Sequence, residues 1–186
     1  IDIGTNGEIV LGNKEFLIAA SASAGPAFEG SGVSCGMRAS KGAIQKVSIN
    51  PKNLEVKYNT IGEEKPRGIC GSGYIDLISE MLRVGLIDKS GKIQARDSQR
   101  IRSGEYGVEF VLAFKDEADS SSDIVITEAD IENIKRAKAA IYSATAILAR
   151  HIGLDFSKIK KFFIAGGFGT YIDVASAINI GILPDL

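Results

Sequence analysis

Alternating apolar and polar residues predict a β-hairpin at the start of the chain. Its strands are expected over 7–12 and 14–20, with Gly12-Asn13, a pair favoured in tight turns, between them. The residues that follow, 21–42, are small and glycine-rich without a clear period. They indicate a long ordered loop or a broken helix.

Alternation also marks two later extended regions. Strands over 43–49 and 54–61 are expected to form a second hairpin, because the turn-forming run Asn50-Pro51-Lys52-Asn53 separates them. Residues 92–115 are expected to be extended as well, with 108–112 as the best strand. The pattern therefore predicts β structure on both sides of the first helix.

That first helix is predicted over 73–84. Ser72 or Gly73 is expected to cap its start, and Gly85 to end it. Its apolar residues fall on one face at helical spacing: Ile75, Ile78, Met81 and Leu82. One face of this helix is therefore expected to be buried.

A longer helix is predicted over 127–152, after an acidic, serine-rich stretch at 116–123 that is expected to be a mobile surface loop. Thr127 and Asp130 resemble a capping box, and Gly153 is expected to end the helix. Apolar residues recur along it at helical spacing: Ile131, Ile134, Ala137, Ile141, Ala144, Leu148 and Ile152.

The end of the chain predicts a strand, a glycine turn and a short helix. Residues 161–165 are apolar enough for a buried strand, which runs directly into the glycine-rich residues 166–170. Asp173 is expected to cap a helix that closes at Gly181. With no repeat or linker apparent, the order of elements predicts a single α/β domain over 1–186, with a mixed sheet and helices on its faces.

Composition excludes several classes of function. The chain has 186 residues with a net charge of −1, so no broad attraction to nucleic acid or to an anionic membrane is expected. No apolar run is long enough to suggest a membrane span. Cys35 and Cys70 fit no metal or disulfide pattern, which favours a reducing, cytoplasmic location. His151, in the last turn of a predicted helix, is expected to be structural.

The first candidate site is the segment Ile1-Asp2-Ile3-Gly4-Thr5-Asn6-Gly7. Glycines allow backbone N–H groups to approach an anion, and Asp2 can hold a water bound to Mg²⁺. The segment therefore predicts part of a nucleotide-phosphate site, with an ordinary hairpin turn as the alternative. Since almost no residues precede Asp2 to form its strand, the chain is expected to be a piece of a longer protein.

Three further clusters are candidates. Residues 166–169 follow a predicted strand, where nucleotides usually bind, although tight packing is the alternative and no Walker pattern is present. Residues 70–74 open a helix whose free N–H groups favour an anion, with a flexible cap as the alternative. Glu29 and Arg38 lie in small, apolar surroundings, where they can contact a ligand or a partner, pair with each other or face solvent.

Taken together, these motifs resemble the C-terminal domain of the reductive activators of corrinoid proteins. These are ATP-dependent iron–sulfur proteins of the actin, sugar-kinase and heat-shock-chaperone ATPase (ASKHA) superfamily. The similarity lies in segments spread over nearly the whole chain, namely 1–11, 24–30, 34–38, 68–73 and 163–169. It implies a ribonuclease-H-like, actin-like ATPase fold, of which this chain is the second, nucleotide-binding half with inserted β-hairpins.

The resemblance also implies the site. Asp2, Gly4, Thr5 and Asn6 are expected to be the second phosphate turn. Asp2 is the expected catalytic residue, which holds Mg²⁺ through water or orients the attacking water. Gly166, Gly167, Phe168 and Gly169 are expected to form the adenosine turn, and Gly71, Ser72 and Gly73 to add ATP contacts. The [2Fe–2S] domain and the first phosphate turn are expected only upstream. This piece alone is therefore predicted to bind ATP weakly or not at all, without turnover.

By this resemblance, ATP hydrolysis is coupled to electron transfer that returns cobalt(II) corrinoid to cobalt(I). The expected partner is a corrinoid iron–sulfur protein or a corrinoid methyltransferase component, and the protein is expected to be a homodimer. Two alternatives are kept. One is a small-molecule kinase, or an activator of another reductase, with the same fold. The other is a dimerisation or docking module that uses the hairpins at 43–61 and 92–115.

Overall fold

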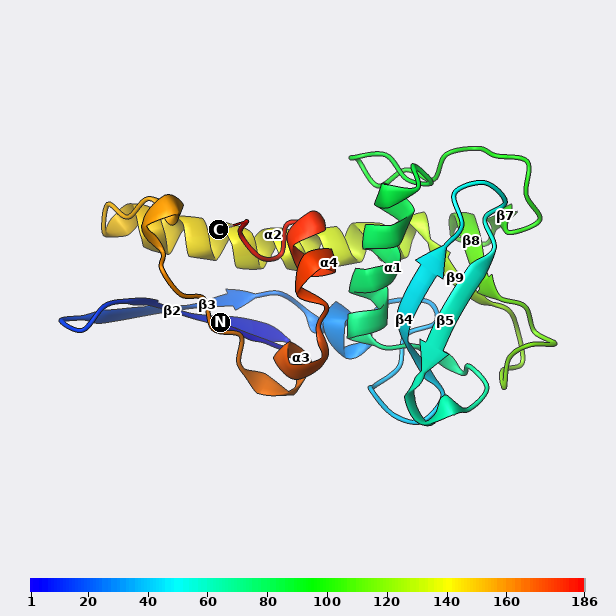
Figure 1. Cartoon of the computed structure of the whole chain (residues 1–186), viewed down its shortest axis with the longest axis horizontal. Coiled ribbons are helices and arrows are strands. Elements are labelled where there is room, and N and C mark those ends of the chain that lie inside the picture. Colours follow the sequence, from blue (N-terminus) through cyan, green and yellow to red (C-terminus); the bar gives the residue numbers. More distant parts are fainter. Residues whose placement is uncertain (186) are drawn as a thin grey trace.

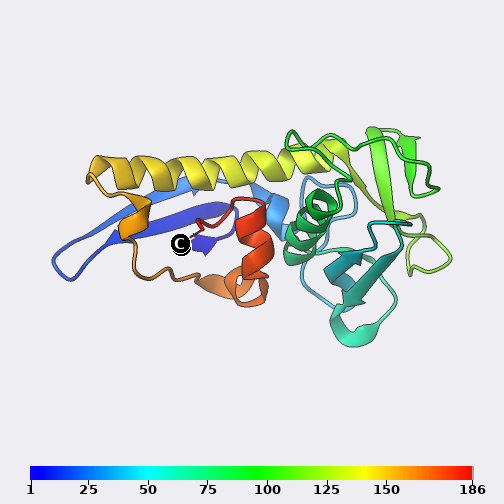
Figure 2. The ribbon, with the colours of Figure 1, turned by 45° about the horizontal axis from the view of Figure 1, so that its top comes forward.

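The computed structural model describes residues 1–185 and divides the strands among three sheets of three strands each. The elements in chain order are β1 (Asp2–Ile3), β2 (Asn6–Gly12), β3 (Leu17–Ser23), η1 (Pro26–Glu29), β4 (Ala43–Ile49), β5 (Val56–Thr60), η2 (Ile61–Glu63), β6 (Gly68–Ile69), α1 (Gly71–Arg83), β7 (Ile101–Gly104), β8 (Gly107–Ala113), β9 (Ile124–Thr127), α2 (Glu128–His151), η3 (Phe156–Lys158), α3 (Gly166–Tyr171) and α4 (Val174–Asn179), where η marks a 3₁₀ helix. In Figures 1 and 2, α2 runs along the β2–β3 hairpin, and β4, β5 and β7–β9 lie at the other end of the molecule. The α/β class is confirmed, with three small sheets in place of one mixed sheet.

The first sheet, in the order β1-β2-β3, is antiparallel throughout and confirms the first hairpin. The turn predicted at Gly12-Asn13 is wrong, because Gly12 pairs with Leu17 and leaves four residues, 13–16, in the turn. The Asn13 side-chain oxygen accepts a hydrogen bond from the Glu15 N–H at 2.8 Å and favours this longer turn. On the face towards α2, a Cβ at Gly7 would lie 2.8 Å from Ile141 Cγ1, so glycine allows the helix to pack closely.

The segment 161–165, predicted as a buried strand, is extended but barely paired. Ala165 forms a parallel bridge with Asp2, and its N–H donates to the Ile1 carbonyl at 2.7 Å. Phe163 is 74% exposed, so the prediction of a buried strand is wrong. Because β1 contains two residues, it offers too short a ladder to hold the whole segment as a strand.

The second sheet, in the order β5-β4-β6, confirms the second hairpin and is closed on one edge by α1. The N–H groups of Val47 and Ile49 in β4 donate to Asp76 Oδ2 at 2.7 Å and to Glu80 Oε2 at 2.9 Å. Since Asp76 and Glu80 are one helical turn apart, α1 satisfies two N–H groups of β4 that no strand reaches. The two-residue strand β6 is too short to be predicted by alternation.

Asp76→Asn is expected to lower the free energy of unfolding by about 1–3 kcal/mol, measured by urea denaturation. Asp76 accepts from two donors, the Val47 N–H and the Ser176 hydroxyl, each at 2.7 Å. Asparagine can keep both contacts only if its oxygen accepts from Val47 and its nitrogen donates to the Ser176 hydroxyl, and both hydrogen bonds then lose the charge of the carboxylate. The matched control is Asp97→Asn at an exposed loop position, which is expected to stay within about 0.5 kcal/mol. Equal stability of the two variants would contradict this role.

The third sheet, in the order β7-β8-β9, confirms the strand predicted over 108–112. The residues before β9 form the predicted loop, whose mobility stays a prediction. At its end, Asp123 accepts from the Lys115 N–H at 2.7 Å and forms an ion pair with Arg102 at 2.7 Å. Strand β9 was not predicted, because it is short and buried throughout and so does not alternate.

The two main helices are confirmed, with one correction at the start of α1. Cys70 is the N-cap of α1, so the caps predicted at Ser72 or Gly73 are wrong. At α2 the capping box is confirmed, since Thr127 Oγ1 accepts from the Asp130 N–H at 3.1 Å and Asp130 Oδ2 from the Thr127 N–H at 2.9 Å. Within residues 1–185, no helix is both long enough and apolar enough to cross a membrane.

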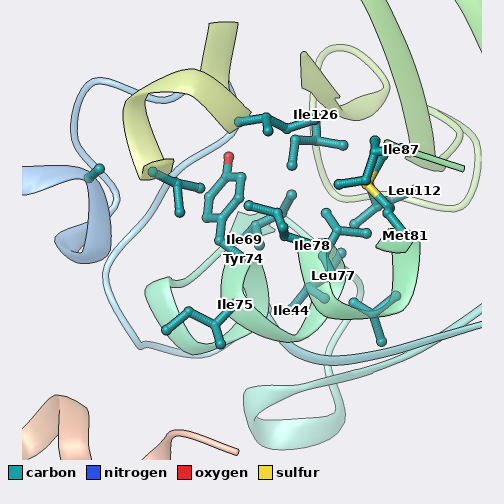
Figure 3. Packing of buried hydrophobic residues seen from close by; sticks show 14 of the residues in the cluster. Ile44, Ile69, Tyr74, Ile75, Leu77, Ile78, Met81, Ile87, Leu112 and Ile126 are labelled. Atoms are coloured by element: carbon teal, nitrogen blue, oxygen red, sulfur yellow. The ribbon is translucent and has the colours of Figure 1, made fainter. Parts of the chain in front are cut away.

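The core forms between α1, β4 and the third sheet (Figure 3). Tyr74, Leu77 and Met81 of α1 are fully buried, together with Leu112 of β8 and Ile126 of β9. Figure 3 shows the Tyr74 ring pointing from α1 towards the start of α2. Burial raises the pKa of Tyr74 well above its ordinary value, and the nearby Asp130 carboxylate adds to this. The side chain is therefore neutral. The burial of Tyr74, Leu77 and Met81 fixes the position of α1 in the core.

Candidate functional site

A cleft of about 540 Å³ lies where β1, η1, the loop at 37–39, the start of α1 and α3 meet. Its lining residues are Ile3, Phe28, Glu29, Met37, Arg38, Ala39, Cys70, Gly71, Ser72, Gly167, Phe168 and Tyr171. Segments distant in sequence, with residues from all four candidate clusters, thus meet around one opening. A cleft of this size and mixed lining is suited to a small ligand with both apolar and charged parts.

Asp2 and Gly166 bring the first and last predicted turns into contact. The backbone pairs Asp2 with Ala165, and Gly166 follows with φ at +80°. A Cβ at Gly166 would lie 2.1 Å from Asp2 Oδ1, far inside the van der Waals limit. The glycine is therefore required twice, for its backbone conformation and for the room that the Asp2 carboxylate occupies.

Thr5 holds the carboxylate of Glu29. The Thr5 N–H donates to Glu29 Oε1 at 3.0 Å, and the Thr5 hydroxyl donates to Glu29 Oε2 at 2.7 Å. Among residues 1–185, Glu29 forms no ion pair with Arg38. The alternative that these two residues pair with each other is therefore wrong, and the partner of Glu29 is Thr5. The Gly4-Thr5 turn therefore has the chemistry of an anion site.

The start of α1 contributes Gly71 and Ser72 to the cleft. A Cβ at Gly71 would lie 1.9 Å from the Phe28 carbonyl oxygen, so a side chain there would push η1 away from α1. Because α1 begins at Gly71, the first N–H groups of this 13-residue helix lie beside the cleft. Such N–H groups and the helix dipole favour a negatively charged ligand.

In α3, Gly167 and Phe168 face the cleft. The Phe168 ring packs against Phe28 with 5.5 Å between centroids, which gives the cleft an apolar wall. A Cβ at Gly167 would meet nothing within 4 Å, so this glycine leaves open space. The wall therefore combines an aromatic face with room for a flat group.

Seven predicted residues are not among those lining the cleft: Asp2, Gly4, Thr5, Asn6, Gly73, Gly166 and Gly169. Asp2 and Gly166 lie next in the chain to the lining residues Ile3 and Gly167, and Thr5 binds the lining residue Glu29. A Cβ at Gly73 would lie 2.1 Å from the Ile44 carbonyl oxygen, which places this glycine against β4. Gly169 packs similarly, with its Cβ position 2.5 Å from Ile164 Cγ2. Asn6 starts β2, where it pairs with Ser23. The close contacts at Gly73 and Gly169 correspond to packing, the alternative raised for glycine clusters from sequence.

Sequence reasoning missed several lining residues. Ile3 and Met37 lie inside candidate segments but were not named as site residues. Ala39 and Tyr171 lie outside every candidate segment, because single apolar residues in loops and short helices carry no pattern of their own. Within residues 1–185, no three His, Cys, Asp or Glu side chains gather as metal ligands. A Mg²⁺ ion at this cleft would therefore take most of its ligands from phosphate and water, as is usual for that ion.

Comparison with known proteins defines the class. A family model described as the C-terminal domain of RACo, the ASKHA domain, matches residues 1–186. The chain belongs to this family of ASKHA domains, which confirms the resemblance drawn from the motifs. A solved structure of a reductive activator for corrinoid, iron-sulfur protein superimposes with a TM-score of 0.94 at 54% identity, covering 100% of this chain and 30% of that one. The ASKHA fold is thereby confirmed.

Two curated relatives also carry names that refer to corrinoid activation or to a corrinoid protein. The chain is 40% identical to "Corrinoid activation enzyme RamQ" of Eubacterium limosum, over 100% of this chain and 32% of the relative. It is 31% identical to "[Co(II) methylated amine-specific corrinoid protein] reductase" of Methanosarcina barkeri, over 98% of this chain and 34% of the relative. The chain thus spans about a third of the length of these relatives.

Proposed function

We propose that this chain is the nucleotide-binding part of an ATP-dependent reductive activator that returns a cobalt(II) corrinoid protein to cobalt(I). The observation that carries the proposal is the contact between Asp2 and Gly166, which unites a carboxylate turn and a glycine turn. These two residues are the chain neighbours of Ile3 and Gly167, which line the cleft. The names of the relatives support the corrinoid part of the proposal.

The residues present fit a magnesium nucleotide. Thr5 already binds a carboxylate through two hydrogen bonds, so the same donors can bind a phosphate oxygen. Gly71 and Ser72 offer N–H groups at a helix start, and Arg38 offers positive charge. Asp2 would hold Mg²⁺ through water, and Phe168 with the open space at Gly167 would receive the base. When bound, Mg²⁺ neutralises phosphate charge.

In this proposal the electron comes from a reduced [2Fe–2S] cluster outside residues 1–186. Such a cluster would supply the one electron that reduces cobalt(II) to cobalt(I) and would itself be oxidised. Reduction to cobalt(I) is uphill for ordinary donors, so ATP must favour a state of the complex in which transfer is possible. The task of Asp2, Thr5 and the helix start is to bind and orient the nucleotide for that change.

The test uses the complete protein under anaerobic conditions with a reductant and a cobalt(II) corrinoid protein. The cobalt(I) absorption band is followed with Mg-ATP, with Mg-ADP and without nucleotide. Growth of the band only with Mg-ATP is the expected result. If ATP is hydrolysed while cobalt stays oxidised, the corrinoid function is wrong and the kinase or other-activator alternative takes its place. Homodimerisation and a cytoplasmic location stay predictions.

A further inference from the structure

The Glu29 carboxylate occupies the position at the Gly4-Thr5 turn where a phosphate is proposed to bind. Both of its carboxylate oxygens are bound by Thr5, one by the N–H at 3.0 Å and one by the hydroxyl at 2.7 Å. Oε1 also lies 3.3 Å from the position that a Cβ on Gly4 would take, so the carboxylate rests against the glycine. We propose that Glu29 is a resident competitor of the nucleotide phosphate at Thr5, and that it lowers nucleotide affinity. This inference rests on the proposed function.

The backbone that carries Glu29 is fixed. Phe28 is buried and packs against Phe168, and Gly30 has φ at +83° with its Cβ position 2.5 Å from the Met37 nitrogen. The 3₁₀ turn η1 is therefore held on both sides of Glu29. The Glu29 side chain is exposed, so it can rotate away from Thr5 while η1 stays in place.

Two anions cannot share the donors of Thr5. Its N–H is a single donor and its hydroxyl carries one hydrogen, so each can serve one oxygen well. A phosphate and the Glu29 carboxylate would also repel each other at this distance. The two states are thus mutually exclusive at Thr5. Arg38, which lines the same cleft, supplies positive charge when the phosphate is bound.

The test measures the dissociation constants of Mg-ADP and of inorganic phosphate for the complete protein by isothermal titration calorimetry. Glu29→Ala removes the carboxylate that Thr5 binds. Both ligands are then expected to bind about tenfold more tightly, which corresponds to about 1.4 kcal/mol of binding free energy. Glu29→Gln, which removes the charge but keeps the size, is expected to give a smaller gain. The control is Glu15→Gln, which removes a charge from the exposed turn between β2 and β3 and leaves Thr5 untouched. It is expected to change affinity less than twofold.

The outcomes separate the two proposals. If wild type binds nucleotide and Glu29→Ala binds it no tighter or more weakly, Glu29 is a structural latch or a direct ligand, and this inference fails alone. If neither binds nucleotide or phosphate at millimolar concentration, the proposed function fails and this inference falls with it. Thermal melting of each variant checks folding, and where Glu29→Ala does not fold, Glu29→Gln decides.

Discussion

Asp2→Asn is expected to lower the rate of ATP-dependent cobalt(I) formation by about 100- to 1000-fold. Asparagine keeps the size of aspartate, so the close contact with Gly166 and the pairing with Ala165 are retained. The substitution removes the negative charge that is proposed to hold Mg²⁺ through water. The rate is measured from the cobalt(I) absorption band with saturating Mg-ATP, and folding from thermal melting.

The control for this change is again Glu15→Gln, in the exposed turn between β2 and β3. Both variants remove one carboxylate charge from the same hairpin sheet, but Asp2 contacts Gly166, whereas Glu15 lies in the turn at the far end of the β2–β3 hairpin. Glu15→Gln is expected to keep the rate within about twofold, since long-range effects between exposed charges are screened by salt. Equal rates in Asp2→Asn and wild type would remove Asp2 from the proposed mechanism.

Gly166→Ala is expected to weaken Mg-ADP binding by about 100-fold or more and to lower the melting temperature. The added Cβ would lie 2.1 Å from Asp2 Oδ1, and φ at +80° disfavours alanine. Either the Asp2 carboxylate or the turn must move, so the contact that carries the proposed function is lost. Calorimetry measures the affinity, and a thermal scan measures the stability.

The neighbouring glycine provides a matched stability control. A Cβ at Gly167 would meet no atom within 4 Å, and this residue lies inside α3. Gly167→Ala is therefore expected to leave the melting temperature unchanged or to raise it slightly, because alanine favours helix. If the two alanine variants melt alike, the crowding inferred at Gly166 is wrong.

Local signals explain which elements the sequence could predict. The hairpins follow from alternation within a few residues, and α2 follows from Thr127, Asp130 and a long apolar period, all of which lie close together in sequence. Strands β6 and β9 are too short for a period to appear. The burial expected at 161–165 failed because it depends on a partner strand, and β1 has two residues.

The parts of the site that could be predicted are those with a local sequence motif. Asp2 and Gly166 were candidates because a carboxylate or a glycine turn beside a strand has recognisable chemistry. Their contact, across more than 160 positions, depends on the pairing of Asp2 with Ala165. Glu29 reaches Thr5 from 24 residues away, and this separation carries no local pattern, so its partner could come only from the fold.

The hydrogen bonds from β4 to Asp76 and Glu80 limit where another chain can pair with the second sheet. A bare strand edge offers N–H groups on which a foreign strand can pair, and proteins commonly block such edges. Along β4 those groups belong to Val47 and Ile49, and α1 has taken both. The other edge strand, β6, is already paired on its outer side, because Ile69 exchanges backbone hydrogen bonds with Cys35 and Met37. Any chain that extends the second sheet by strand addition must therefore pair with β5, on the side away from α1.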